Sequence, residues 1–289
     1  MYGIVTPGAV ARGLNQSVHW DATTAVLLVL IGVGVGAFGT VVGAGGGFVL
    51  TPVLLLLYPH DSARTLTAIS LTAVFFNAAS GSAAYLRQRR VDVRSGAVFA
   101  AATLPGAVGG ALLTDVVSRS VFDGVMGGVL AALAIWLAVG GRWRPRGARG
   151  ARRRTLVGRD GLVYEYDVPL LRGALYSLGV GFVSSFLGIG GGVIHVPLLV
   201  RALGFPTHIA TATSHFVLAW MAGTGTLTHV VAGSFAHGHG VRRAVALSVG
   251  VVAGAQLGAR ISRRLGGHHI ERALALALLA LAIRLFFSV

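Results

Sequence analysis

The feature that most constrains the fold is the duplication of a glycine-rich motif. The pattern G-x-G-G-G-x-x-x-x-P occurs at Gly43–Pro52 and again at Gly188–Pro197, at an offset of 145 residues. Three more blocks recur in the same order at offsets of 144 to 148: Thr67–Ser70 with Thr211–Ser214, Pro105–Ala111 with Ala253–Ala259, and Leu133–Leu137 with Leu281–Leu285. Four blocks at a nearly constant offset indicate one unit present twice.

Each copy is built from apolar segments that match the thickness of a bilayer. The 289 residues are 54% hydrophobic and only 11% charged, against about 25% charged residues in an average soluble domain. We expect helices at about 23–43, 47–58, 65–86, 95–114 and 120–140, and at about 171–187, 192–204, 208–232, 242–262 and 269–288. Most of them approach the roughly 20 residues that span the hydrocarbon. The sequence predicts an all-α polytopic protein of the cell (plasma or inner) membrane.

The repeat divides the chain into four parts. These are an N-terminal lead-in at 1–21, a first transmembrane repeat at 22–141, an arginine-rich cytoplasmic linker at 142–169, and a second repeat at 170–289. In the linker, Asp160-Gly161 is a turn signal, and the next residues alternate between apolar and polar. This pattern predicts a small hairpin.

The distribution of arginine gives the orientation. All 24 basic residues are arginine and the net charge is +15. They lie in short loops between apolar segments, which favours the positive-inside rule over nucleic-acid binding. Basic loops at 87–94, 142–159 and 260–264 are then cytoplasmic. Arg242 and Arg243 fall near the outer face, against this bias.

The number of crossings decides how the two halves are related. The second segment of each half reaches only about 18 Å at 1.5 Å per residue, against a core of about 30 Å, so it is a short or broken helix. Five crossings in each half make the second half an inverted repeat of the first, whereas four make the halves parallel. We favour the inverted repeat, with four to five segments in each half.

The glycine motifs are the first candidate for a binding site. Broken backbone at membrane depth is tolerated only where it is buried in protein or lines a cavity. A half-helix follows each motif, and its N-terminal N–H groups favour an anion. Close helix packing by small residues is the alternative. The candidate residues are Gly43, Gly45, Gly46 and Gly47 of the first motif, and Gly188, Gly190, Gly191 and Gly192 of the second.

Polar residues in the apolar segments complete the candidate substrate site. They are Ser70, Asn77, His195, Thr211, Thr213, Ser214 and His215. Hydroxyl and amide groups can donate to an oxyanion, although Ser and Thr can also satisfy helix carbonyls. Because no carboxylate lies in the middle of a segment, histidine is the available titrating group if transport is coupled to protons. A neutral buried histidine is the alternative.

Other functional classes lack their residues. The chain has no cysteine, no H-E-x-x-H, no phosphate-binding loop and no Ser–His–Asp set with a buried acid. We therefore expect neither an enzyme nor a bound metal or cofactor.

These motifs resemble those of the sulfite exporter TauE/SafE family of membrane permeases. The resemblance rests on Gly43–Pro52 with Thr67–Ser70, on Gly179–Pro197 with Ala210–Ser214, and on the linker pattern Asp160-Gly-x-x-Tyr-x-Tyr166. It implies gradient-driven movement of sulfur oxyanions or organosulfonates, often as export. Two equivalent positions differ between the halves, because His195 matches Leu50 and His215 matches Leu71.

The sequence thus predicts a secondary transporter whose anion binds near the midplane between the two glycine-rich half-helix N-termini. The resemblance implies that this anion belongs to the sulfite, sulfonate or thiosulfate class. An uptake carrier or channel for another small anion, or a membrane subunit that does not transport, are the alternatives. The expected partners are this anion and the lipid bilayer, with no nucleic acid; a homodimer is possible.

Overall fold

The computed structural model describes residues 21–139, 152–235 and 239–286. The lead-in expected at residues 1–21, apart from Asp21, lies outside the described residues, as do residues 140–151, which include the start of the linker. The boundaries of the four parts stay a prediction.

The chain is helical where the apolar segments are. The first half forms α2 (Ala22–Val42), α3 (Gly47–Leu57), α4 (Ala63–Arg87), α5 (Val93–Leu113) and α6 (Arg119–Val139). The second forms α7 (Leu170–Leu187), α8 (Gly192–Pro197) with its continuation η1 (Leu198–Ala202), α9 (Thr207–Val231), α10 (Gly240–Ser262) and α11 (Gly267–Phe286). Within the described part, six helices are long and apolar enough to cross a membrane. The prediction of an all-α polytopic membrane protein is confirmed.

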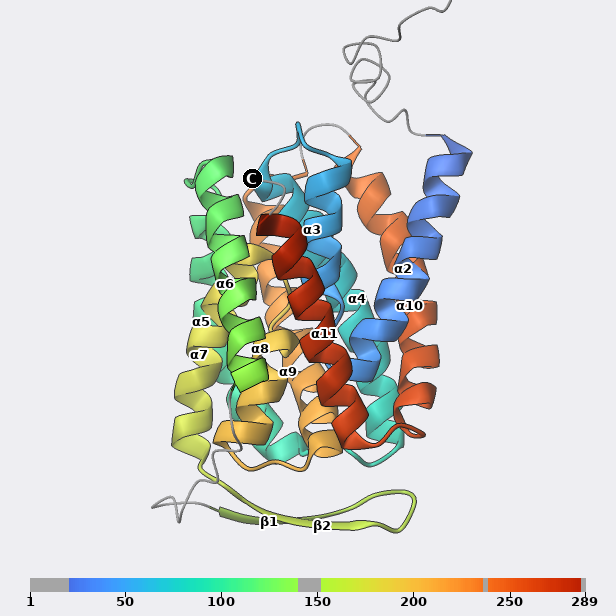
Figure 1. The fold of residues 1–289 in the computed structure, drawn as a ribbon, viewed down its shortest axis with the longest axis vertical. Coiled ribbons are helices and arrows are strands. Elements are labelled where there is room, and N and C mark those ends of the chain that lie inside the picture. Colours follow the sequence, from blue (N-terminus) through green and yellow to red (C-terminus); the bar gives the residue numbers. More distant parts are fainter. Residues whose placement is uncertain (1–20, 140–151, 236–238, 287–289) are drawn as a thin grey trace, which may run out of the picture.

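A β-hairpin connects the two halves. Strands β1 (Arg152–Val157) and β2 (Val163–Val168) pair antiparallel around a turn in which Gly161 has φ 79°. The hairpin lies across one end of the helical bundle (Figure 1). The Arg159 N–H donates to the Gln88 carbonyl (3.1 Å), and the Tyr166 hydroxyl donates to Asp92 (3.1 Å), so the hairpin docks where α4 ends and α5 begins.

The two halves are interlocked, with each long helix packed on a partner from the other half. The most extensive interfaces lie between α2 and α10 and between α5 and α7. In the repeat, α2 corresponds to α7 and α10 to α5, so these two interfaces are equivalent. At the centre α4 packs on α9. These two helices are equivalent in the repeat, so exchanging the two halves leaves this pair unchanged. The contacts therefore follow a pseudo-two-fold axis between α4 and α9.

Equivalent helices run in opposite directions along the bundle. Helix α2 begins at the end opposite the hairpin, whereas α7 begins beside the hairpin (Figure 1). Helix α4 ends at the hairpin, while α9 begins there, with Ile209 in the same apolar cluster as Tyr166 of β2. These directions agree with an inverted repeat, but the inversion itself and its orientation in a bilayer stay predictions.

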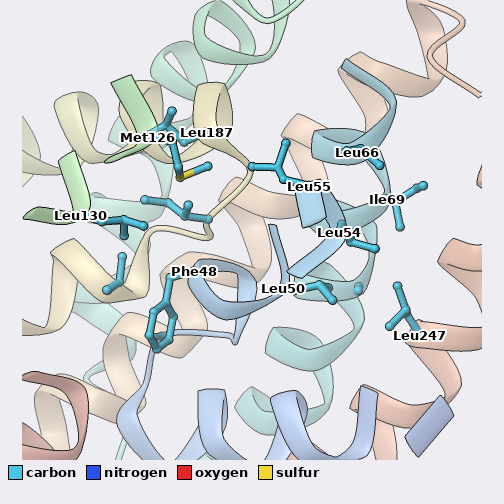
Figure 2. Packing of buried hydrophobic residues seen from close by; sticks show 14 of the residues in the cluster. Phe48, Leu50, Leu54, Leu55, Leu66, Ile69, Met126, Leu130, Leu187 and Leu247 are labelled. Atoms are coloured by element: carbon cyan, nitrogen blue, oxygen red, sulfur yellow. The ribbon is translucent and has the colours of Figure 1, made fainter. Parts of the chain in front are cut away.

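The short helix α3 is held inside the bundle. Phe48, Leu50 and Leu54 are each at most 1% exposed. Figure 2 shows them with Leu66 of α4 and Leu247 of α10 around them. Burial of these residues fixes where the glycine turn before α3 lies, whereas Leu56 and Leu57 at the other end of the helix are exposed.

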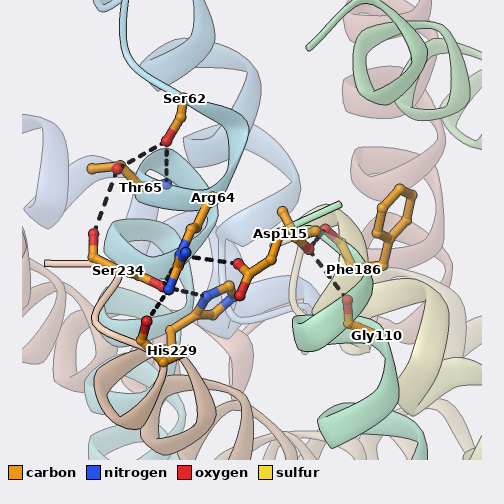
Figure 3. Close-up of polar contacts among 10 residues, drawn as sticks. Ser62, Arg64, Thr65, Gly110, Asp115, Phe186, His229 and Ser234 are labelled. Carbon is orange, nitrogen blue, oxygen red and sulfur yellow. Dashed lines mark hydrogen bonds and ion pairs between the residues drawn. The ribbon is translucent and has the colours of Figure 1, made fainter. Parts of the chain in front are cut away.

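Charges at the face opposite the hairpin are paired within the protein. Arg64 lies 3.0 Å from Asp115 (Figure 3), and Arg243 pairs with Asp61 while its guanidinium lies 3.7 Å from the centre of the Tyr58 ring. Neutralisation by a carboxylate is the reason why Arg243 can lie at this face, against the arginine bias of the loops.

Candidate functional site

Each glycine motif makes a turn between two helices. Gly43 and Gly188 end α2 and α7 in the left-handed conformation, with φ of 77° and 67°. Gly45 and Gly190, the next equivalent pair, also have positive φ. Since L-residues with a side chain rarely adopt this conformation, glycine is required at these positions. The chain then enters α3 or α8, as the sequence predicts.

The two turns pack directly on each other. A Cβ atom added to Gly47 would lie 2.6 Å from the carbonyl carbon and oxygen of Ile189. A Cβ atom on Gly192 would overlap the Gly43 carbonyl oxygen and Ala44. The glycines therefore let the backbone of one half touch that of the other at the centre of the molecule. Close packing is thus one of their roles in this conformation.

Two serines hold the turns reciprocally. The Ser70 hydroxyl of α4 donates to the Gly188 carbonyl (2.7 Å), and the Ser214 hydroxyl of α9 donates to the Gly43 carbonyl (3.3 Å). The Thr51 hydroxyl reinforces the first contact at 2.7 Å from the same carbonyl. Each half therefore uses its central helix to fix the glycine turn of the other half.

Two further hydroxyls lie beside the turns with no partner in the described structure. They belong to Thr67 and Thr211, which are repeat equivalents and are fully buried. Gly188 faces Thr67 across the turn, and Gly43 faces Thr211 in the same way. A buried hydroxyl without a partner costs free energy, so these groups are available to a ligand.

We call the place where the two glycine turns pack on each other the glycine crossing. A third polar group lies on one side of it. Asn77 Oδ1 lies 3.2 Å from both Thr40 Oγ1 and His215 Nε2, and these last two atoms are 3.3 Å apart. All three side chains are fully buried. The Asn77 amide donates to the Gly36 carbonyl (3.0 Å). The Tyr85 hydroxyl donates to the Thr40 carbonyl (2.7 Å), and its ring stands edge-on to His215. We call Thr40, Asn77 and His215 the polar cluster.

The equivalent position in the other half is mostly apolar. The repeat offsets match Thr40, Asn77 and His215 with Ser185, Met221 and Leu71. The packing agrees: Gly81 lies against His215 and Thr40, while its equivalent Gly225 lies against Leu71 and Ser185. The polar cluster therefore breaks the pseudo-symmetry of an otherwise duplicated core.

Two predicted site residues lie away from this group. His195 Nε2 lies 3.1 Å from the Ser177 hydroxyl of α7, and its ring packs edge-on against Phe99 of α5. The Thr213 hydroxyl accepts from the Asp92 N–H (3.0 Å) at the start of α5. The structure thus brings Ser70, Ser214, Thr211 and the glycines together and places Asn77 with His215, while His195 and Thr213 serve other contacts.

Three residues of the site were missed from the sequence. Thr40 is the last polar residue of the apolar run of α2, Thr51 lies inside the glycine motif, and Tyr85 lies four residues after Gly81 on α4. For Thr40 the repeat offered a signal, because a polar residue near the glycine turn recurs as Ser184 and Ser185 in the second half. Among the described residues, no group of three or more His, Asp or Glu side chains is placed to hold a metal ion.

Comparison with known proteins identifies relatives along almost the whole chain. The probable membrane transporter protein YunE of Bacillus subtilis is 28% identical over 270 residues, covering 91% of this chain and 97% of that protein. A probable membrane transporter protein of Xylella fastidiosa is 28% identical over 267 residues, covering 89% of this chain and 94% of its own. One from Methanocaldococcus jannaschii is 21% identical, covering 85% and 89%.

No solved structure matches the chain. The family model described as sulfite exporter TauE/SafE matches residues 28–285, which include both glycine turns, the hairpin and the polar cluster. The chain belongs to the sulfite exporter TauE/SafE family.

Proposed function

We propose that this protein is a secondary transporter of the cell membrane that moves small sulfur-containing anions, such as sulfite or an organosulfonate, and that its usual direction is export. The membrane-spanning fold, the family and relatives named as probable membrane transporters support this class. The substrate is the narrower part of the proposal.

The observation that carries the proposal is the buried polar cluster beside the glycine crossing. Thr40 and His215 can both donate hydrogen bonds, and each lies within reach of the Asn77 carbonyl oxygen. An oxyanion could replace that oxygen as the acceptor. This exchange would hold an anion without the help of a metal ion or an arginine, because hydrogen bonds to a charged acceptor are stronger than those to a neutral one.

The crossing itself favours a carrier over an open pore. The backbone of one turn occupies the space beside the other, which closes the centre of the bundle in this conformation. Passage of an anion then requires the two halves to shift at the crossing. An inverted repeat provides two mirrored arrangements of this kind, one open to each side.

His215 gives the cluster a way to couple transport to protons. It is the one member of the cluster with a side chain that can gain or lose a proton to change its charge. The imidazolium would attract the anion and the imidazole would release it. In this respect His215, rather than His195, is the coupling residue of the proposal, since His195 lies away from the cluster.

Sulfite flux into proteoliposomes, with and without an imposed pH gradient, tests the proposal. We expect saturable flux that responds to the gradient, with empty vesicles as the baseline. In His215→Gln the response to the gradient should disappear. In His195→Gln, the matched substitution of a second buried histidine, it should remain. Folded protein that moves neither sulfite, sulfonates nor thiosulfate would contradict the proposed substrate class.

A further inference from the structure

A cavity lined mainly by arginine lies at the hairpin end of the protein. It is partly open, has a volume of about 390 Å³ and is lined by the end of α4, the end of α10 and the turn between β1 and β2. Its charged lining consists of five guanidinium groups and one carboxylate: Arg87, Arg90, Arg159, Arg260, Arg263 and Asp160. One carboxylate cannot neutralise five guanidinium groups, so the cavity attracts anions.

One of these arginines is built into the protein rather than lying on its surface. Arg90 is only 6% exposed. Its Nη2 donates to Asp160 at 2.9 Å, while its Nη1 is buried and has no partner among the described residues. A buried guanidinium N–H without an acceptor is costly. The cavity that Arg90 lines is where an acceptor can be supplied.

The single carboxylate is already engaged. Asp160 Oδ2 accepts from Arg90, and its Oδ1 accepts from the Leu162 N–H at 3.3 Å. The hydrogen bond from Arg90 also holds the pKa of Asp160 below its ordinary value. Asp160 thus fixes the direction of Arg90 but leaves Nη1 and the other four guanidinium groups to a ligand.

We propose that this cavity is a second anion site, separate from the glycine crossing, which binds a sulfate-like or phosphate-like group through Arg90 and the surrounding guanidinium groups. Guanidinium groups present paired donors that fit such oxyanions. Two sources of this chemistry can reach the site: a free oxyanion, or the phosphate of an anionic lipid.

The position of the cavity links it to the polar cluster. Ala84 and Gln88 of α4 line the cavity, and between them on the helix Tyr85 contacts Thr40 and His215. The Tyr85 side chain therefore lies between an anion in the cavity and the polar cluster. The binding claim itself does not depend on transport and can be tested without it.

Titration of purified protein with sodium sulfate in a neutral detergent at low salt tests the site. We expect saturable binding by the wild-type protein. Arg90→Gln and Arg260→Gln should each weaken binding at least about five-fold. Asp160→Asn should strengthen it, because the variant removes the competing carboxylate and keeps all five arginines. Arg153→Gln, on the exposed part of β1, is the matched control and should bind as the wild type does.

The same titration repeated with phosphatidylglycerol in the micelles separates the two sources. If the lipid phosphate is the occupant, the lipid should displace sulfate from the wild-type protein. If a free oxyanion is the occupant, sulfate should bind equally well with and without the lipid. Absence of sulfate binding in both titrations would overturn the proposal. So would Arg90→Gln and Arg260→Gln proteins that stay folded and bind like the wild type. Equal weakening in Arg90→Gln and Asp160→Asn would show that docking of the hairpin, not the guanidinium groups, controls binding.

Discussion

Replacing Gly47 by alanine should force apart the two turns at the centre of the molecule. The added Cβ would lie 2.6 Å from the carbonyl carbon and oxygen of Ile189 and 2.6 Å from a methyl group of Val74. Ordinary contacts between such atoms begin at about 3.5 Å, so the turns would have to separate by about 0.9 Å. A change of rotamer cannot relieve an overlap with backbone. Gly47 does not require positive φ, so the effect is steric.

The magnitude follows from the packing. Adding a carbon to a well-packed core costs about 1–3 kcal/mol, and a backbone neighbour places Gly47→Ala near the upper end, at about 3 kcal/mol. For a chain of this size that lowers the melting temperature by roughly 6–12 °C. Gly128→Ala on α6 is the control, because no atom lies within 4 Å of its added Cβ; better helix propensity should leave it neutral or up to about 1 kcal/mol more stable.

Thermal melting in detergent, followed by tryptophan fluorescence, measures both variants. A Gly47→Ala protein that melts within about 2 °C of the wild type and of Gly128→Ala would refute the inference that the two turns are in backbone contact.

Three further perturbations have defined outcomes. Ser70→Ala removes a buried donor to the Gly188 carbonyl and should lower the free energy of unfolding by about 1–2 kcal/mol. An unchanged melting temperature would contradict this role of Ser70. Arg243→Gln removes the ion pair with Asp61 and the contact with the Tyr58 ring, and should cost about 1–2 kcal/mol; a neutral effect would show that the pair contributes nothing. The pKa of Asp160 is lowered by Arg90, so docking of the hairpin is fully stabilised above the ordinary pKa of about 4 and weakens as the pH falls through the lowered value. Protection of the β1 and β2 amides, measured by hydrogen exchange and corrected for the intrinsic exchange rate at each pH, should therefore be weaker at pH 3 than at pH 7. Equal protection at both pH values would contradict the pairing.

The sequence was sufficient to predict the architecture because the relevant signals are local. Apolar length, glycine and proline placement, and the Asp160-Gly161 turn act over a few residues, and the helices and the hairpin lie where these signals put them. The repeat offset also told which residues are equivalent.

The contacts between the halves could not be predicted in the same way. Ser70 and Ser214 were expected to face a ligand, but each donates to the glycine turn of the opposite half. That pairing depends on a pseudo-two-fold axis between α4 and α9, which no spacing along the chain reveals. His195 was grouped with the site because it follows a glycine motif, whereas the direction of α8 turns it toward α5 and α7.

The most direct test of the proposed function is counterflow of labelled sulfite into proteoliposomes preloaded with unlabelled sulfite. A carrier whose anion binds at the polar cluster predicts a transient accumulation of label above its equilibrium level. Asn77→Met should abolish that accumulation while the protein stays folded, since methionine is the equivalent residue, Met221, in the other half. Label that only equilibrates in the wild type, or full accumulation in Asn77→Met, would contradict a carrier that works through this cluster.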